Sequence, residues 1–345
     1  MSKNELLHKV QGGIGWITLN RPEALNALSL AMIRGLSQLL KDWERDESVR
    51  AVVIEGAGEK AFCAGGDVRA VYEAKQKGDT HIPDAFFREE YTLNTYIHTY
   101  PKPYISLIDG IAMGGGLGVS VNGSYRIVTE RALLAMPETG IGFFPDVGAT
   151  TFLNAAPGIT GLYLALTGTR LKAVDALWAK LATHFIPSSS LSLFKNDLEQ
   201  GSSLEKALVQ HCTHPSEHGF LEDHTAQIEQ HFQRSSLLNI LNGLKTNPSP
   251  FAQNTYNTLM TKSPTSLAVV FRQLTQANSD FKERMKQEFR LSQRFIEGHD
   301  FGEGVRAVLI DKDHLPHWSP QTIEEVTSET IDHYFSSLSE KELIL

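Results

Sequence analysis

Short apolar runs alternate with glycine and polar breaks at the start of the chain. Leu6–Val10 and Ile14–Leu19 flank Gly12-Gly13, a pair that favours a tight β-hairpin turn. Arg21–Leu28 is typical of a loop, and Ser29 after it is a good N-cap for a helix. The segment that follows repeats apolar residues at helical spacing and predicts one buried stripe, made of Met32, Ile33, Leu36, Leu39, Leu40 and Trp43.

Strand-like and helix-like segments then alternate. Ala51–Ile54 predicts a short buried strand, and Glu59–Asp67 predicts a loop after it. The carboxylate of Asp67 can cap a helix that begins at Val68. Phe86–Thr99 predicts a further helix.

The centre of the chain repeats this order. Tyr104–Ile108 and Tyr125–Thr129 are apolar, β-rich runs, and between them lies Gly114–Gly116, followed by small residues that can form a helix. Ile159–Thr167 and Ala173–Ala182 predict helices. Alternating strands and helices indicate an α/β fold in which most strands pair in parallel.

The pattern changes near Pro187, where Ser188–Ser190 marks a loop and the residues beyond are polar and helix-periodic. Asn247–Pro250 is a second break, and Thr265–Glu297 predicts one or two long helices. We therefore expect an α/β core over residues 1–190 and a helical C-terminal region over residues 191–345 that packs on it. We find no internal repeat.

Composition narrows the class of protein. The 345 residues are 41% apolar and 21% charged, as in ordinary globular chains, and contain no apolar run of about 18 residues that predicts a membrane span. The first ten residues lack both a secretory apolar core and a transit-peptide composition, so we expect the cytoplasm. Cys63 and Cys212 are too few for a disulfide framework, and the net charge of −8 argues against nucleic acid as a partner.

Two glycine turns are candidate anion sites. Ala64–Asp67 and Gly114–Gly116 each follow a β-like run and precede a helical one. Two converging main-chain N–H groups stabilise negative charge on a thioester oxygen, and each such donor contributes about 3 kcal/mol to lowering a reaction barrier. Glycine also lets a substrate approach the backbone closely. Either turn alone is equally typical of a plain strand-to-helix turn, and no G-x-G-x-x-G nucleotide motif is present.

Carboxylate side chains are the second group of candidate functional residues. Glu138 lies in a loop with Phe143 and Phe144, whose apolar rings would desolvate it and raise its pKa, as suits a base or nucleophile. Asp146 can act beside it, or can cap a helix through Thr151–Leu153, and both roles can coexist. Glu89-Glu90 on the predicted helix would by default face solvent.

Other residues with reactive side chains give weaker evidence for a catalytic or metal site. Cys63 has no nearby histidine to activate it and is typical of a small buried thiol. No G-x-S-x-G motif of a serine hydrolase occurs. A polar segment has several histidines at ligand-like spacing, but its composition favours a solvated surface over a metal site: His211, His214, His218, His224 and His231.

Taken together, the motifs RPEALNAL, AFCAGGDV, DGIAMGGGLG and MPETGIGFFPDVG resemble, in order and spacing, the signatures of the crotonase (enoyl-CoA hydratase/isomerase) superfamily. Similarity continues in LTGTRLKAVDALWAKLATHFI, SPTSLAVVFRQL and EGVRAVLIDKDHLPHW, and is weakest from Pro187 to about Asn247. The resemblance implies a spiral of ββα units with C-terminal helices and an acyl-CoA substrate. It also implies an oxyanion hole formed by the N–H groups of Gly66 and Gly115.

The resemblance further implies that loops at Ala24-Leu25 and Ala64-Gly65 line the CoA moiety. Hydratases of the superfamily carry a catalytic glutamate two residues past the triple glycine, where this chain has Gly118, whereas the second family glutamate is kept as Glu138. The residues FFREEY, MPET and FPDVG resemble the branch that hydrolyses 3-hydroxyisobutyryl-CoA in valine breakdown. Its substrate-contacting positions carry over to Glu90, Gly115, Glu138 and Asp146.

We therefore predict a hydrolase of short 3-hydroxyacyl-CoA thioesters, with no metal or redox cofactor and coenzyme A entering as part of the substrate. Two rival hypotheses stay open, a hydratase or isomerase that uses Glu138 alone and a CoA-binding protein without activity. An RNA-binding relative is disfavoured by the acidic charge. Lys60 and Arg21 lie near the loops expected to hold the CoA phosphates. The superfamily often forms trimers and hexamers, so a homo-oligomer is one option, although this branch can place its C-terminal helices over its own core.

Overall fold

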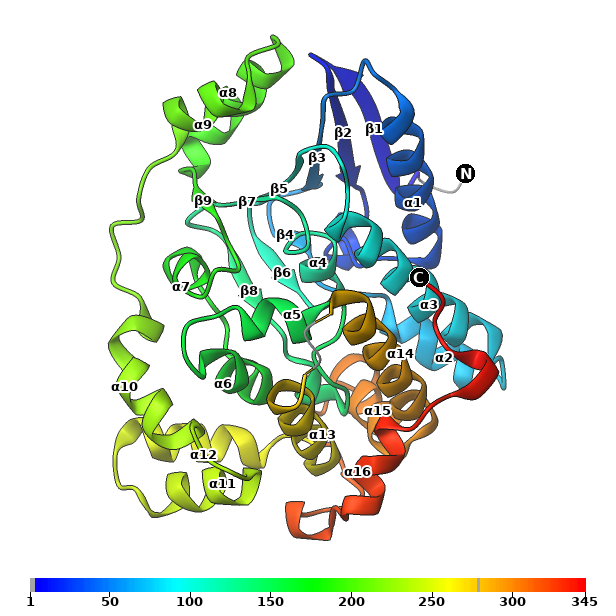
Figure 1. The fold of residues 1–345 in the computed structure, drawn as a ribbon, viewed down its shortest axis with the longest axis vertical. Coiled ribbons are helices and arrows are strands. Elements are labelled where there is room, and N and C mark those ends of the chain that lie inside the picture. The colour runs from blue at the N-terminus through cyan, green and yellow to red at the C-terminus, as the bar shows by residue number, and fades with distance from the viewer. Residues whose placement is uncertain (1–3, 278–279) are drawn as a thin grey trace. The chain divides into compact units, whose positions relative to one another are not determined.

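The computed structural model describes residues 4–277 and 280–345 (Figure 1). Contacts divide the chain into two units. Unit 1 comprises the chain up to Asp67 together with Thr92–Ala135 and Arg170–Phe220, and unit 2 comprises Val68–Tyr91, Met136–Thr169 and Leu221–Leu345. Each unit is thus assembled from three segments, whereas we had expected one boundary near residue 190. That division into domains stays a prediction.

Unit 1 contains two sheets. The larger sheet pairs its strands in the order β1 (Leu6–Gln11), β2 (Ile14–Leu19), β3 (Ala51–Gly56), β5 (Tyr104–Ile108), β7 (Tyr125–Val128) and β9 (His184–Phe185). Only the β1–β2 pair is antiparallel among these. The smaller sheet is parallel and consists of β4 (Ala61–Cys63), β6 (Ile111–Met113) and β8 (Leu133–Ala135).

The chain visits the two sheets in turn. Each pass runs through a strand of the larger sheet, a strand of the smaller sheet and then a helical segment, as in β3–β4–α2 and β5–β6–α4 (Figure 1). A strand therefore meets the next strand of its own sheet only after a crossover, which makes the pairing parallel. This succession is the predicted spiral of ββα units, and the α/β class is confirmed.

The hairpin and the first helix follow local signals. Gly12 and Gly13 have φ angles of +64° and +75°, as a primed two-residue turn requires at both positions. Helix α1 (Leu30–Arg45) starts after Ser29, whose hydroxyl accepts a hydrogen bond from the Met32 N–H. Its buried residues fall on the predicted apolar stripe. Both elements are therefore confirmed.

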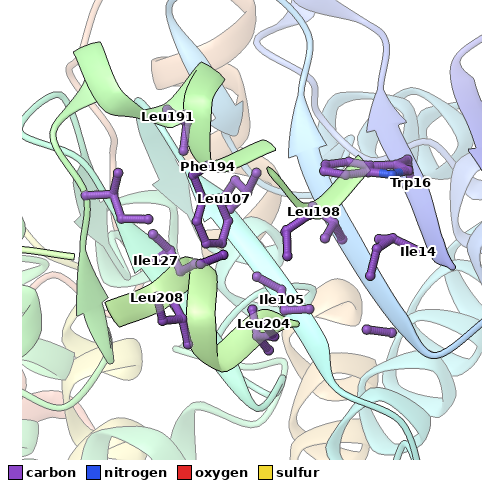
Figure 2. Packing of buried hydrophobic residues seen from close by; sticks show 14 residues of the cluster. Ile14, Trp16, Ile105, Leu107, Ile127, Leu191, Phe194, Leu198, Leu204 and Leu208 are labelled. Carbon is purple, nitrogen blue, oxygen red and sulfur yellow. The ribbon is translucent and has the colours of Figure 1, made fainter. Parts of the chain in front are cut away.

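The core of unit 1 lies on one face of the larger sheet (Figure 2). Helices α8 (Ser188–Glu199) and α9 (Leu204–His211) cover this face. Leu191, Phe194 and Leu198 recur at helical spacing and pack with Ile105 and Leu107 of β5. Each such side chain contributes roughly 2 kcal/mol when it is fully buried, so this cluster fixes the sheet on which the loops of the site are carried.

Unit 2 is helical in the described residues. Its longer elements are α2 (Val68–Gln76), α6 (Thr160–Thr167), α10 (Phe220–Phe232), α11 (Leu237–Thr246), α12 (Pro250–Met260), α13 (Pro264–Thr275), α14 (Phe281–Glu297), α15 (His299–Val305) and α16 (Ser328–Phe335). The segment Thr265–Glu297 is thus two helices, and Asp280 caps the second by accepting from the Glu283 N–H. Helices α11 and α12 lie side by side (Figure 1). The predicted helical C-terminal part is confirmed.

Three predicted helices have different bounds. Helix α3 (His81–His98) begins before Phe86, and α7 (Ala173–Trp178) ends before Ala182 because Lys180 takes a left-handed φ of +62°. Helix α4 (Gly115–Gly118) is only one turn long, since glycines give little helix propensity. None of the helices in the described part of the chain is both long and apolar enough to cross a membrane.

Candidate active site

The two glycine turns of unit 1 pack against each other. A Cβ atom on Gly116 would lie 2.1 Å from the Cys63 carbonyl oxygen, which no side chain can accept. A Cβ atom on Gly65, whose φ is +126°, would lie 3.9 Å from the Gly115 nitrogen. The turn after β4 and the turn before α4 are therefore neighbours, and glycine is required at position 116 by close backbone approach and at position 65 by the positive φ.

The N–H groups of Gly66 and Gly115 are not used to build these turns. The described main-chain hydrogen bonds here have other donors, among them the N–H groups of Leu28, Asp67 and Leu117. Gly114 is the N-cap of α4, so Gly115 is its first residue and has no acceptor within the helix. Because α4 is a single turn, any anion there depends on the N–H groups themselves.

The loops expected to line CoA also meet in unit 1. The Ala64 N–H donates to the Leu25 carbonyl at 3.0 Å, which joins the Ala24-Leu25 loop to Ala64-Gly65. Arg21 is held by Asp67 at 3.0 Å and by Glu5 at 3.4 Å, so its charge is already compensated. Lys60 is exposed. Of the two basic residues near these loops, Lys60 is the better candidate for a CoA phosphate.

Glu138 and Asp146 lie together in unit 2. Glu138 opens the short helix η2 (Glu138–Ile141) and is 6% exposed, and Asp146 is 5% exposed. The loop between them is anchored by Phe143, whose ring contacts those of Phe87, Phe144, Phe295 and Phe301. Glu138 is therefore buried, and the loop that follows it packs in an aromatic core.

Helix α3 adds two groups to these acids. Tyr91 donates its hydroxyl to Asp146 Oδ2 at 2.7 Å. Glu90 is 2% exposed, so it faces inward, as the resemblance implied and against the default for paired acids on a helix. Oε1 of Glu90 and Oε2 of Glu138 are buried and have no hydrogen-bond partner in the part of the chain that the structure describes. Such atoms are costly in a folded protein and are typical of positions that bind a ligand.

A fourth carboxylate comes from α14. Glu288 is fully buried and, with Glu90, Glu138 and Asp146, forms a group that we call the carboxyl cluster. Asp146 is its centre, because its charge acts on Glu138 and Glu90 and the charge of Glu288 acts on it.

Burial and mutual repulsion set the protonation of the carboxyl cluster. Burial raises the pKa of Glu138 well above its usual range, and the charge of Asp146 raises it further. The same two causes raise the pKa of Glu90. Burial raises the pKa of Asp146 to about 7, although the Tyr91 hydroxyl opposes the change. Burial also raises the pKa of Glu288 to about 7. Asp146 and Glu288 therefore exchange protons near neutral pH, as acid–base chemistry requires.

The predicted capping role of Asp146 is wrong. Helix α5 (Ala149–Asn154) has Gly148 as its N-cap and no side-chain cap of its own. The N–H groups of Gly148 and Thr150 instead donate to Glu288, at 2.7 and 3.0 Å. Because Glu288 takes this task, the Asp146 side chain is left to face Tyr91.

Sequence reasoning missed Tyr91, Asn94 and Glu288. Asn94 follows Glu90 by one helical turn on α3, is fully buried, and has no partner for its amide within residues 4–277 and 280–345. Asn94 could have been found from its spacing of four residues from Glu90, whereas Tyr91 directly follows Glu90 and is typical of a core residue. Glu288 has no such signal, because it lies 138 residues from Thr150 and reads as one more polar residue of a helix.

The histidine segment has structural contacts. His211 bonds to Asp197 at 2.8 Å, and the rings of His224 and His231 stack on Phe251. Within the described residues, no three His, Cys, Asp or Glu side chains lie close enough to hold a metal ion. Cys63 is buried, as predicted.

Comparison with known proteins places these features in a family. A model described as enoyl-CoA hydratase/isomerase matches residues 14–335. The chain belongs to this family. It is 47% identical over 352 residues to the mitochondrial 3-hydroxyisobutyryl-CoA hydrolase of Danio rerio, covering 99% of this chain and 92% of the relative. The human enzyme of the same name is 44% identical over 349 residues, with 98% and 90% covered.

Solved structures of the family match the fold over nearly the whole chain. A carnitinyl-CoA dehydratase from Mycobacterium thermoresistibile has a TM-score of 0.94 at 38% identity and covers 99% of both chains. An enoyl-CoA hydratase from Rhodobacter sphaeroides has a TM-score of 0.93 at 34% identity, with 99% of this chain and 100% of the other covered. The relatives thus have names from two reaction classes, hydrolysis and hydration, and the chemistry of the site must separate them.

Proposed function

We propose that this protein hydrolyses the thioester of a short 3-hydroxyacyl-CoA, with 3-hydroxyisobutyryl-CoA as the first candidate. The products are the free hydroxy acid and coenzyme A. The observation that carries the proposal is the carboxyl cluster, in which Glu138 is buried beside Asp146 with one carboxylate oxygen unpartnered in the described residues. The curated relatives named as hydrolases support the choice of substrate, and with it the role in valine breakdown that the resemblance implies.

The hydratase alternative lacks an acid. Addition of water across a double bond in this family draws on two carboxylates, and the position of the first is Gly118 here. Gly118 has no side chain that could act as an acid, and its carbonyl accepts from the side-chain amide of Asn122 at 2.9 Å. Hydrolysis of a thioester needs only one base or nucleophile, which Glu138 supplies in this proposal.

In the proposed reaction the N–H groups of Gly66 and Gly115 bind the thioester oxygen as it becomes negative. Glu138 attacks the carbonyl carbon to form a mixed anhydride and release the CoA thiolate, or it takes a proton from the water that attacks. Glu90 receives the hydroxyl of the acyl group, and Asp146 orients that hydroxyl or the water. The CoA moiety lies along Ala24, Leu25, Ala64 and Gly65. These groups suffice for thioester hydrolysis, so the proposal names no cofactor besides the CoA of the substrate.

A direct test measures two activities of the same purified protein, thioester hydrolysis and hydration of a double bond. Purified protein is mixed with 3-hydroxyisobutyryl-CoA, and free thiol is followed with a colorimetric reagent. In parallel, crotonyl-CoA is supplied and the absorbance of its double bond is followed. Thiol release with unchanged crotonyl absorbance supports hydrolysis. Loss of crotonyl absorbance without thiol release would instead support the hydratase, and CoA-ester binding with neither signal would support a non-catalytic protein.

A single turnover in ¹⁸O-water separates the two routes for Glu138. Direct attack by water places ¹⁸O in the hydroxy acid. A mixed anhydride that water opens at the Glu138 carbonyl transfers an unlabelled oxygen from the protein to the product, and the label is then found in Glu138 by mass spectrometry. The cytoplasmic location and the homo-oligomer stay predictions, and the curated relatives named above are mitochondrial.

A further inference from the structure

The turn that carries Asp146 is held from outside by two buried side chains. Glu288 of α14 accepts three hydrogen bonds, from the N–H groups of Gly148 and Thr150 at 2.7 and 3.0 Å and from the Thr150 hydroxyl at 2.6 Å. Gln273 of α13 donates to the Pro145 carbonyl at 2.8 Å and to the Thr150 hydroxyl at 2.8 Å. These bonds fasten the backbone on both sides of Asp146.

A buried carboxylate is a costly way to cap a helix of six residues. A serine or an aspartate at the N-cap would satisfy the same N–H groups without taking a charge out of water. Glu288 is 0% exposed and comes from a helix remote in sequence, so its presence here calls for a further role. Its nearest functional neighbour is Asp146, on which its charge acts.

We propose that Glu288, together with Gln273, is the positioning residue for Asp146. It acts in two ways. Its three hydrogen bonds fix the turn from Asp146 to Thr150, and this keeps the Asp146 carboxylate against the Tyr91 hydroxyl. Its negative charge also makes Asp146 harder to ionise, so that Asp146 retains a proton at a higher pH than it otherwise would. This inference rests on the proposed function, because it assigns a role to Asp146 in thioester hydrolysis.

Other charged or titratable groups lie on the elements around Asp146, and they stay in place when Glu288 is substituted. Glu90 and Tyr91 face it from α3 and Glu138 from η2. On α14, Arg284 donates to the Thr151 hydroxyl at 3.1 Å and partly offsets the charge of Glu288. On α13, Arg272 pairs with Asp332. Of these groups, Glu288 is the one that both bonds to the turn and bears a negative charge.

The experiment compares three variants in the full chain. Glu288→Gln keeps the size of the side chain but removes the charge and one acceptor. Thr150→Val removes both hydrogen bonds of the Thr150 hydroxyl, to Glu288 and from Gln273, and leaves the charge of Glu288 in place. Asp300→Asn is the matched control, because Asp300 is another buried acid of unit 2, which accepts from the Ser263 hydroxyl at 2.5 Å and from the Ser319 N–H at 2.8 Å.

For Glu288→Gln we expect kcat for thiol release to fall by about 10- to 100-fold with little change in KM, since misplacement of a reacting group has effects of this size. The acid limb of the pH profile should move to lower pH by roughly one unit, because a neighbouring negative charge is gone. Thr150→Val and Asp300→Asn should lower the melting temperature but leave the acid limb in place. An unmoved acid limb in Glu288→Gln, or one that moves equally in Asp300→Asn, would overturn the proposal.

A second measurement needs no turnover. The free energy of unfolding is determined against pH for the wild type, Asp146→Asn, Glu288→Gln and the double variant. If Glu288 faces Asp146 as inferred, the stabilisation that Asp146→Asn gives at pH 8 should shrink by about half or more in the Glu288→Gln background. Equal stabilisation by Asp146→Asn in both backgrounds would contradict the inference. Coupling without thiol release from any short acyl-CoA would instead refute the proposed function and leave the placement of Asp146 intact.

Discussion

The glycine turns at Ala64–Asp67 and Gly114–Gly116 offer main-chain N–H groups, whereas the carboxyl cluster offers side chains from separate elements. The turns are fixed by backbone contact alone, with Gly116 against the Cys63 carbonyl. The cluster instead depends on α3, η2, α14 and the turn at Asp146, which pack around an aromatic core. An N–H group keeps its charge distribution at any pH, but burial raises the pKa of every acid in the cluster, to about 7 for Asp146 and Glu288. We therefore expect the turns to respond to added volume and the cluster to respond to charge and pH.

The largest expected effect is on the acids. Glu138→Gln keeps the shape of the side chain but can neither attack nor take a proton, so we expect kcat to fall by about 10³-fold. The affinity for a CoA ester, measured by calorimetry, should change little because the N–H groups are untouched. Activity within tenfold of the wild type in the thiol-release assay would show that Glu138 has no such role.

Added volume should break the turns. In Gly116→Ala the new methyl group would meet the Cys63 carbonyl at 2.1 Å, so we expect the free energy of unfolding in urea to fall by about 3 kcal/mol. Gly201→Ala is the control in the same unit, because Gly201 has nothing within 4 Å of its Cβ position, although its φ of +86° makes any side chain there strained. That variant should lose only about 1 kcal/mol from backbone strain. Equal losses of unfolding free energy in the two variants would mean that the close approach of the turns does not contribute to stability.

The cluster should make stability depend on pH. The pKa of Asp146 is raised from 3.8 to about 7 in the folded state, so folding is favoured by the proton and stability is lost as pH rises from about 4 through 7. One pKa unit corresponds to about 1.4 kcal/mol, which bounds the cost of ionisation at about 4 kcal/mol. Asp146→Asn also weakens the acceptor of the Tyr91 hydroxyl, so we expect a net gain of about 2 kcal/mol at pH 8. Urea titrations at pH 5 and pH 8 test this, and a gain at pH 5 as large as at pH 8 would contradict it.

The smallest expected effect concerns substrate choice. If Glu90 binds the hydroxyl of the acyl group, Glu90→Gln should reduce the preference for 3-hydroxyisobutyryl-CoA over isobutyryl-CoA by about tenfold in kcat/KM, since a bond to a charged acceptor is exchanged for a neutral one. Glu89→Gln, at the half-exposed neighbouring position, is the control and should leave the preference unchanged. An unaltered ratio in Glu90→Gln would show that the hydroxyl is bound elsewhere.

The glycine turns and the carboxyl cluster also differ in how much of them could be predicted from the sequence. The turns were found because their signal is local, a β-like run followed by glycines and a helix start. The small residues after Gly114 were expected to be able to form a helix, and the structure gives one turn, because packing against β4 requires glycine where a helix would prefer alanine.

The acids were found less completely. Glu138 and Asp146 stand out in a loop with proline and phenylalanine, but the capping role given to Asp146 was wrong because Glu288 performs it. Glu288 and Thr150 are 138 residues apart, so no local sequence pattern indicates their contact. Tyr91 was missed for a different reason, since an aromatic residue on a helix is ordinarily part of the core.

The interleaving of the two units has a consequence for synthesis on the ribosome. Once residue 220 has been added, the chain holds every segment of unit 1, including both glycine turns. Val68–Tyr91 and Met136–Thr169 have by then been made as well, but their remaining partners, among them Glu288, are still to come. Glu90, Glu138 and Asp146, which are buried in the folded protein, are therefore already synthesised while Leu221–Leu345 are still being translated. A polypeptide truncated soon after residue 220 would contain every strand of both sheets but would lack Glu288.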